Sequence, residues 1–532
     1  MTSLAHQIPT QSNADPNASL DEAIERAERA LLGMQRADGH WVFELEADAT
    51  IPAEYILLLH YLDEREPELE AKLAVYLRRI QNPDGSWPLF HRGDGDVSAT
   101  VKTYYALRLA GDALDAPHLA AARSWVLAHG GAARCNVFTR IALASFGQVP
   151  ARAVPAMPVE IMLLPRWSPF HLERVSYWSR TVIVPLLILL ALRPRARNPL
   201  GIGVAELFVT PPERERTYHR PATPTFVARA FLALDTSLRA LEPLVPKALR
   251  ARAIRAAERF VRTHLNGEDG LGAIFPAMAN ALMALDALGY PPTHPERMLA
   301  KRALEKLLVV GEREAYCQPC VSPIWDSALA AHALLETGSD AGREAATHAC
   351  AWLEGRQILG VVGDWAAQRP GLRPGGWAFQ YWNDFYPDVD DTAVVAMALH
   401  RSEPQRFANA LARADEWVQG MQSKGGGWGA FDADNTHFEL NHIPFADHGA
   451  LLDPPSEDVS ARCVGMLLQL GYSTLEPCVA RGLAYLERAQ QPDGSWFGRW
   501  GTNYVYGTWS VLAALGAAGK TATNSESVRR AL

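Results

Sequence analysis

The stretch QNPDGSW, residues 81–87, recurs along the chain with small changes and decides the fold class. Close copies are QRADGHW at 35–41, QSKGGGW at 422–428 and QQPDGSW at 490–496. Each begins with Gln and has a Gly-bearing turn and then a Trp six residues after the Gln. Glycine lets the chain turn left-handed after a helix, and a Gln side chain can bond free backbone groups at a neighbouring helix end. The recurrence predicts helix pairs that stack on their neighbours, as in solenoids or closed double rings of helices.

Amphipathic helices are predicted between these turns, and the Trp of each turn is expected to stack over its Gln. Weaker copies of the turn occur as GEDGLGAIF and RPGGWAF. Apolar residues recur at helical spacing in the segments 20–35, 248–265, 296–310, 406–422 and 478–490. Because clear strand alternation is scarce, we predict an all-α fold.

Composition narrows the class of protein. The chain has 532 residues and a net charge of −8, without a basic block, so nucleic acid is not expected as a partner. Its six cysteines are scattered, and the CQPC of Cys317 and Cys320 has no second pair at zinc-site spacing. We interpret them as structural or incidental thiols of a reducing compartment.

Two segments, the N-terminal stretch and the most apolar run, indicate where in the cell the protein resides. Residues 1–20 are polar and lack the basic start and apolar core of a signal peptide, which predicts a cytosolic protein. The most apolar run, TVIVPLLILLAL at 181–192, is too short to cross a bilayer and contains Pro185. It is predicted to be a buried core helix, and a surface that dips into one leaflet remains the alternative.

An acid cluster, DVDD at 388–391, follows a proline and precedes an apolar helix. Acids at a helix start cap free N–H groups and favour the positive end of the dipole, which is one explanation of the cluster. The other is chemical, because crowding and burial can keep a carboxyl protonated at neutral pH. The cluster alone does not choose between them.

The repeats and the DVDD motif together resemble the squalene–hopene cyclases, which are bacterial class II triterpene cyclases. The stretches that carry the resemblance are MPVEIMLLPRWSPF, GEDGLGAIFPA, SPIWDSALA, RPGGWAFQ, NHIPFADHGALLDPP and GSWFGRWGTNYVYGTW. The resemblance implies the double-barrel terpene cyclase fold of two α/α barrels. Residues 46–320 would be an inserted barrel, while 16–45 and 321–532 would form the catalytic one.

The implied activity is the proton-initiated polycyclisation of squalene to hopene or hopanol in hopanoid biosynthesis, an isomerase reaction that needs no metal and no organic cofactor. Family members are homodimers that contact the membrane monotopically through an apolar plateau. By resemblance, the chain is therefore expected as a peripheral protein on the cytoplasmic face of the bacterial inner membrane.

Protonating an isolated double bond needs a strong acid, and an ordinary Asp is ionised at pH 7. The resemblance gives the role of general acid to Asp390, with Asp388 and Asp391 holding it and accepting its charge. Asp326 matches a position that assists the acid. Arg462 lies where some members have His, and it is either a fixed counter-cation for the acid or the partner of a plain salt bridge to Asp458. Without a His there, reprotonation of the acid would need a chain of water molecules.

Aromatic faces can steady a growing carbocation without trapping it. The cavity aromatics that the resemblance implies are Trp178, Trp325, Phe379, Phe431, Trp500 and Tyr506. Glu54 and Asp453 match further polar positions of the cavity. Phe431 replaces a tyrosine of some relatives, which is expected to affect how faithfully later rings close. On the residues alone, each of the aromatics also fits core packing.

Several alternatives stay open. The chain stops at GKTATNSESVRRAL, whereas full-length relatives continue, so we also consider a truncated, non-catalytic or partially cyclising remnant associated with the membrane. A class II diterpene cyclase shares the acid motif, and protein prenyltransferases share the helical barrel but need a zinc site. DVDD and DADN (432–435) as calcium ligands lack the loop glycine and distal glutamate of a calcium hand.

Overall fold

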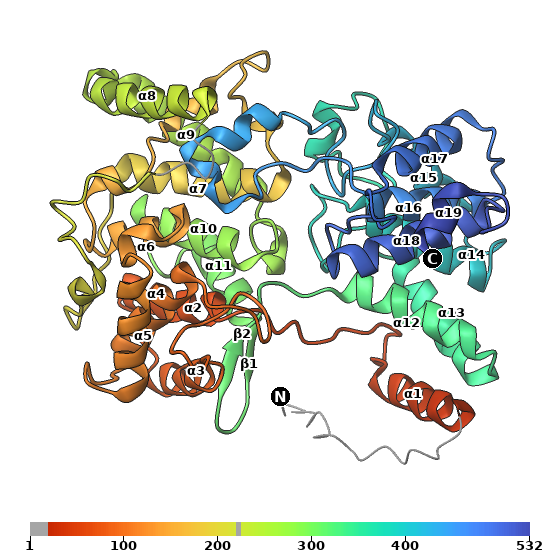
Figure 1. The fold of residues 1–532 in the computed structure, drawn as a ribbon, viewed down its shortest axis with the longest axis horizontal. Helices are drawn as coiled ribbons and strands as arrows, with labels where there is room; N and C mark the ends of the chain where they lie inside the picture. Colours follow the sequence, from red (N-terminus) through yellow and green to blue (C-terminus); the bar gives the residue numbers. More distant parts are fainter. Residues whose placement is uncertain (1–19, 220–224) are drawn as a thin grey trace.

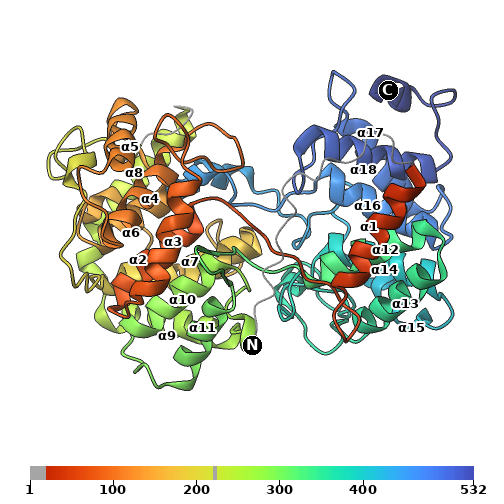
Figure 2. The ribbon, with the colours of Figure 1, turned by 90° about the horizontal axis from the view of Figure 1, so that it is seen from below.

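The computed structural model describes residues 20–219 and 225–532. Two helical lobes lie side by side, joined by extended segments (Figure 1). The first helix, α1 (Leu20–Met34), packs on α12 (Pro323–Thr337) and α13 (Asp340–Glu354) of the second lobe. The chain then runs across to the first lobe (Figure 2). The polar stretch predicted to lack a signal peptide, and residues 16–19 of the predicted catalytic barrel, lie outside the described residues.

The described residues of the first lobe form ten α-helices and one hairpin. Its helices are α2 (Thr50–Leu62), α3 (Pro67–Arg79), α4 (Val97–Leu109), α5 (Pro117–Ala128), α6 (Val137–Ser145), α7 (Tyr177–Leu192), α8 (Phe226–Leu241), α9 (Lys247–Thr263), α10 (Phe275–Ala287) and α11 (Pro295–Glu305). Strands β1 (Leu308–Val310) and β2 (Ala315–Cys317) pair antiparallel. The helix predicted over 296–310 is therefore too long, because the Val-containing end of that segment pairs as a strand.

The second lobe continues with α12 (Pro323–Thr337), α13 (Asp340–Glu354), α14 (Val389–Ser402), α15 (Ala408–Gly420), α16 (Glu457–Gln469), α17 (Pro477–Ala489), α18 (Asn503–Ala517) and α19 (Glu526–Ala531). Two 3₁₀ segments, η9 (Phe438–His442) and η10 (Pro444–His448), leave this lobe and pack on α8 of the first. Apart from the short hairpin, the described residues confirm the all-α prediction.

The repeat Gln side chains tie each turn to another helix. Nε2 of Gln81 donates to the carbonyl of Gly85 at 2.8 Å and to that of His118, in the first turn of α5, at 3.0 Å. The same two bonds recur from Gln35, Gln422 and Gln490. The predicted role of Gln is thus confirmed, because each amide satisfies two carbonyls in a buried joint.

The repeat Trp closes the same joint. Nε1 of Trp87 donates to the carbonyl of Leu77 at 2.7 Å, and its backbone N–H donates to Oγ1 of Thr100 at 3.0 Å. Gly85 has φ of +91°, and a Cβ there would lie 2.6 Å from the backbone of Ala121, so only glycine fits. The predicted stacking of the indole over the Gln amide stays a prediction.

The RPGGWAF copy uses a Gln that sequence spacing hides. Gln357 donates to the carbonyls of Gly375 at 2.8 Å and Ala410 at 2.9 Å, while Trp377 fills the Trp position and is fully buried. Since Gln357 and Trp377 are twenty residues apart, the seven-residue pattern could not find this joint. The joint of Gln357 and Trp377 holds the segment before the acid cluster in the core.

Helix α7 is the apolar run that was predicted to be a core helix. Its side chains from Tyr177 to Leu189 are buried apart from Trp178, and it packs on α9 and α10. The core prediction is confirmed, whereas contact of this helix with one leaflet stays a prediction, since Leu192 at its end is 41% exposed. Within residues 20–219 and 225–532, no helix has the length and apolar character needed to cross a membrane.

Candidate active site

The acid cluster begins helix α14, as its sequence predicts. The side chain of Asp388 caps the helix by accepting from the backbone N–H of Asp390 at 2.7 Å and of Asp391 at 3.2 Å. The carbonyl of Asp388 also accepts from Oγ1 of Thr392 at 2.6 Å. All three carboxyls are buried, so the capping role does not exclude the chemical one.

Asp390 faces a cation from the neighbouring helix α16. Its Oδ1 lies 2.6 Å from Nε of Arg462, and both side chains are 7% exposed. Neither atom has hydrogen-bond geometry with a partner, so the contact is an ion pair without an aligned hydrogen bond. Burial raises the pKa of Asp390 to about 6, against the opposing charge of Arg462 and with a smaller rise from Asp458.

The two flanking carboxyls hold protons more firmly. Burial, followed by the negative charge of Asp390, raises the pKa of Asp388 well above its ordinary value. Burial and then the charges of Asp388 and Asp390 do the same for the pKa of Asp391. Oδ1 of Asp391 has no hydrogen-bond acceptor or donor beside it, which also favours the neutral acid. Both shifts favour the protonated forms of Asp388 and Asp391 over their carboxylates.

Asp458 does not form the salt bridge to Arg462 that the sequence left open. Its Oδ1 accepts from Oγ of Ser456 at 2.6 Å, and its Oδ2 accepts from the backbone N–H of Trp500 at 2.8 Å. Arg462 pairs instead with Asp390, because that carboxylate faces it from another helix. Asp458 thus ties the start of α16 to the Trp500 loop.

Asp326, on α12, lies at the rim of the same region. Its Oδ2 accepts from the backbone N–H of Phe43 at 2.8 Å, and Oγ of Ser322 lies 3.2 Å from both of its oxygens. Burial raises the pKa of Asp326 to about 6. Its charge contributes to the raised pKa of Asp391, which places it within electrostatic reach of the cluster.

Three aromatic rings surround the guanidinium of Arg462. Its Cζ lies 5.0 Å from the ring centre of Trp325, 5.1 Å from that of Tyr506 and 5.5 Å from that of Trp509. The hydroxyl of Tyr506 also accepts a hydrogen bond from Arg462. Trp509 was missed by sequence reasoning, although its position one helical turn after Tyr506 on α18 places both on one face.

A second aromatic group lies between the lobes. The ring centres of Trp178, Phe431 and Trp500 are 5.5 to 6.0 Å apart and meet edge to face. Asp453 supports it by accepting from the backbone N–H groups of Phe431 at 2.7 Å and Asp432 at 2.9 Å. Burial and then the charge of Asp432 raise the pKa of Asp453 to about 7. The structure thus brings these predicted residues together.

Glu54 and Phe379 lie outside both groups. Glu54 pairs with Lys102 in the first lobe, and both line a cavity of about 400 Å³ that Trp178 also lines. Lys102 was missed, and its burial in an apolar helix is the signal that could have found it. Phe379 is half-buried two residues after Trp377, and it joins neither aromatic group.

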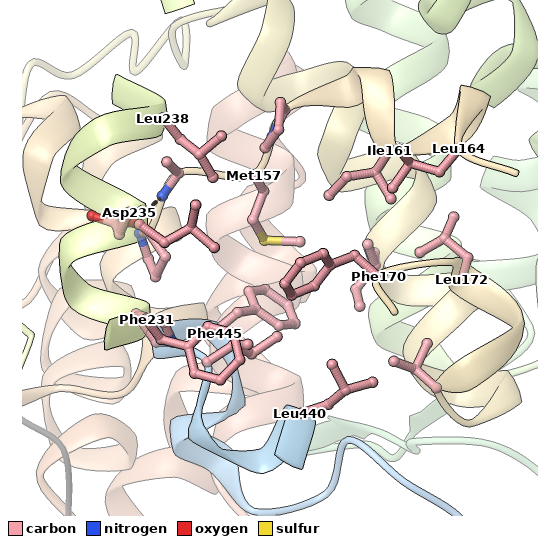
Figure 3. A pocket seen from close by; sticks show the side chains of 18 of the residues that line it. Met157, Ile161, Leu164, Phe170, Leu172, Phe231, Asp235, Leu238, Leu440 and Phe445 are labelled. Atoms are coloured by element: carbon pink, nitrogen blue, oxygen red, sulfur yellow. Dashed lines mark hydrogen bonds between the residues drawn. The ribbon is translucent and has the colours of Figure 1, made fainter. Parts of the chain in front are cut away.

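A second cavity, of about 330 Å³, is almost entirely apolar. Figure 3 shows side chains from the 157–172 segment, helix α8 and the η9–η10 crossover converging on it, with Phe170 and Phe231 close together. Phe445 and Ile183 line both this cavity and the one that holds Glu54, so the two are neighbours.

The acids of the alternative calcium site at 432–435 are paired with arginines. The carboxylate of Asp432 accepts from Nη2 of Arg180 at 3.0 Å, and that of Asp434 accepts from Nη2 of Arg369 at 3.0 Å. Among the described residues, no three His, Cys, Asp or Glu side chains are grouped as metal ligands.

Comparison with known proteins decides the family. The family model described as squalene-hopene cyclase N-terminal domain matches residues 24–313, and the one described as C-terminal domain matches 321–532. The chain belongs to the squalene–hopene cyclase family. With that, the predicted class, an all-α double-barrel terpene cyclase, is confirmed, while the predicted limits of the barrels stay a prediction.

Curated squalene–hopene cyclases resemble the chain over nearly all its length. The protein from Zymomonas mobilis is 57% identical over 97% of this chain and 79% of its own length. That from Bradyrhizobium diazoefficiens is 54% identical over 96% of this chain and 78% of its own. That from Alicyclobacillus acidocaldarius is 39% identical over 93% of this chain and 78% of its own.

Proposed function

We propose that this cyclase protonates squalene at a terminal double bond and folds it into a pentacyclic hopanoid, with Asp390 as the general acid. The observation that carries the proposal is the buried Asp390, whose pKa is raised to about 6 beside a fixed cation. A carboxyl of that kind is still partly protonated near neutral pH, and Arg462 stabilises the carboxylate that remains after proton transfer.

The places of the other residues support roles for them in the same reaction. The raised pKa values of Asp388 and Asp391 favour their neutral forms, which avoid two further negative charges beside the acid and can return a proton to it. Trp325, with its face already on a cation in the resting protein, can turn toward the early carbocation. Trp178, Phe431 and Trp500 offer π faces without a nucleophile for the later ones.

We further propose that squalene reaches the site from a lipid surface. Large apolar side chains are exposed on α8, just after it and on the segment that shares the apolar cavity with it: Trp167, Phe226, Leu241 and Leu244. Phe170 and Leu234 are both partly exposed and line the 330 Å³ apolar cavity, so that cavity opens near this patch. From there Ile183 and Phe445 lead to the cavity lined by Trp178.

By the same family resemblance, we propose a homodimer bound peripherally to the cytoplasmic face of the inner membrane. Sedimentation of the detergent-solubilised protein tests the dimer, and fractionation of cells with protease protection of inverted vesicles tests the location. A monomer, or a chain that stays in the soluble fraction, contradicts the corresponding proposal.

Product analysis tests the activity. The detergent-solubilised protein is incubated with squalene, and products are identified by gas chromatography and mass spectrometry. We expect pentacyclic product, reduced by about 10²-fold or more in Asp390→Asn, because a general acid contributes that much. Asp340→Asn, at a fully exposed carboxylate, is the matched control and should behave as the unmodified chain. Equal product from Asp390→Asn would overturn the acid assignment, and no turnover from folded protein would favour a non-catalytic remnant.

A further inference from the structure

A buried ion network joins the lobes beside the acid cluster. Arg180 of α7 is 4% exposed, and its Nη2 donates to Oδ1 of Asp432 at 3.0 Å. Its Nε lies 3.4 Å from Oδ2 of Asp364. Burial alone would lower the pKa of Arg180, but the two carboxylates hold it above its ordinary value. One cation of the first lobe is therefore clamped between two anions of the second.

Asp364 extends the network to the segment before the acid cluster. Its Oδ2 accepts from the hydroxyl of Tyr386 at 2.7 Å, and its backbone N–H donates to the carbonyl of Phe385 at 3.2 Å. Its Oδ1 lies 3.2 Å from Nε2 of His264, next to the end of α9. Tyr386 is only two residues before Asp388, so the network sits at the base of the acid motif.

The same network places Tyr177. The backbone N–H of Tyr177 donates to Oδ2 of Asp432 at 3.1 Å. Its ring stacks on Tyr386, with ring centres 4.5 Å apart, and lies 4.2 Å from Phe431. Tyr177 and Tyr386 are both buried, and neither was found by sequence reasoning as a site residue. Their stacked rings lie between the acid motif and the Trp178, Phe431 and Trp500 group.

We propose that Arg180 is a positioning residue for the cyclisation, because its ion pairs to Asp432 and Asp364 hold the stacked rings of Tyr177 and Tyr386 at the junction of acid and aromatic wall. This inference rests on the proposed function. The polyene must pass from protonation to later ring closure without a change of alignment, so a shift of the wall relative to the acid releases products with fewer rings. A purely structural role would lower the amount of folded enzyme but leave the product ratio unchanged.

The experiment compares Arg180→Met, which removes the charge, with Arg180→Lys, which keeps it but cannot reach both carboxylates in a fork. Product ratios are measured by gas chromatography and mass spectrometry at equal total turnover, and thermal unfolding is recorded in parallel. We expect the share of mono- and bicyclic products to rise about tenfold in Arg180→Met, with Arg180→Lys intermediate. Arg373→Met removes an exposed Arg that pairs with Glu416, and it should keep the original ratio.

An unchanged ratio in folded Arg180→Met overturns the inference. If that variant does not fold, Tyr386→Phe removes only the hydroxyl from which Asp364 accepts a hydrogen bond. An unchanged product ratio in Tyr386→Phe then overturns the inference. Failure of the unmodified chain to cyclise squalene would instead sink the proposed function. In that case the near-ultraviolet circular dichroism of the stacked tyrosines tests whether Arg180 holds their rings. A spectrum of Arg180→Met identical to that of Arg373→Met overturns the inference.

Discussion

Nε of Arg462 on α16 lies 2.6 Å from Oδ1 of Asp390 on α14. The contact joins Asp390, the proposed general acid, to Arg462, whose guanidinium keeps its positive charge at any working pH. It lowers the pKa of Asp390 against the effect of burial, which leaves that pKa at about 6. The pair thus sets a balance between how often Asp390 carries a proton and how strongly it donates one.

This balance predicts the pH dependence. Only protonated Asp390 can donate, so the rate of cyclisation should fall as pH rises through about 6, the pKa of Asp390. Arg462→Gln removes the cation that lowers this pKa, so the falling limb should move up by about one pH unit or more. The maximal rate should drop about tenfold or more, since the acid is weaker and its carboxylate is unsupported.

Arg462→Lys is the matched variant, because it keeps a positive charge beside the acid. Its falling limb should stay near pH 6, with rates measured from initial product formation between pH 5 and 8. A limb that moves down in Arg462→Gln would contradict the assigned role of the ion pair.

The aromatic group predicts a change in product distribution. Phe431→Leu keeps an apolar side chain but removes the π face that meets Trp178 and Trp500. Because a desolvated cation–π contact is worth about 2 kcal/mol, partially cyclised products should gain about thirtyfold relative to pentacyclic ones. Phe438→Leu, at an exposed ring, provides the control. Identical mass-spectrometric profiles for both variants would contradict a role of Phe431 in stabilising the cation.

The repeats predict a stability effect. Gln422→Ala leaves the carbonyls of Gly426 and Cys478 without the amide that now donates to both, at 2.8 and 2.9 Å. The free energy of unfolding should fall by about 2 kcal/mol, the cost of buried unsatisfied groups. Chemical denaturation measures this, with Gln405→Ala at an exposed Gln as comparison. Equal stabilities would show that the joint contributes no net free energy.

The apolar patch predicts lipid binding. Phe226 is 86% exposed and Leu244 is 75% exposed, so the double variant Phe226→Glu, Leu244→Glu should not disturb the core. Flotation with phospholipid vesicles should recover the unmodified protein and lose most of the double variant, because each buried side chain gives about 2 kcal/mol. Leu475→Glu, at an exposed position on the other lobe, should leave flotation unchanged. Equal flotation of all variants would contradict the lipid-surface route.

Local patterns in the sequence determined most of the secondary structure. The helices between the repeat turns, the Gln bonds of the four seven-residue repeats and the cap by Asp388 all depend on residues a few positions apart, plus one neighbouring helix. The burial of α7 in the core was predicted from its apolar composition alone. Sequence reasoning failed at β1, where three residues that continue an apolar helical pattern pair with β2 instead.

Only the tertiary structure decided which distant charges meet. Asp458 and Arg462 share a helix at a spacing that permits a salt bridge, yet packing of α14 against α16 brings Asp390 to Arg462 instead. Tyr177 and Tyr386, more than two hundred residues apart, carry no pattern that marks them as neighbours. Pairing of buried charges and rings depends on how whole helices pack, and helix packing depends on side chains from the entire chain rather than on local spacing.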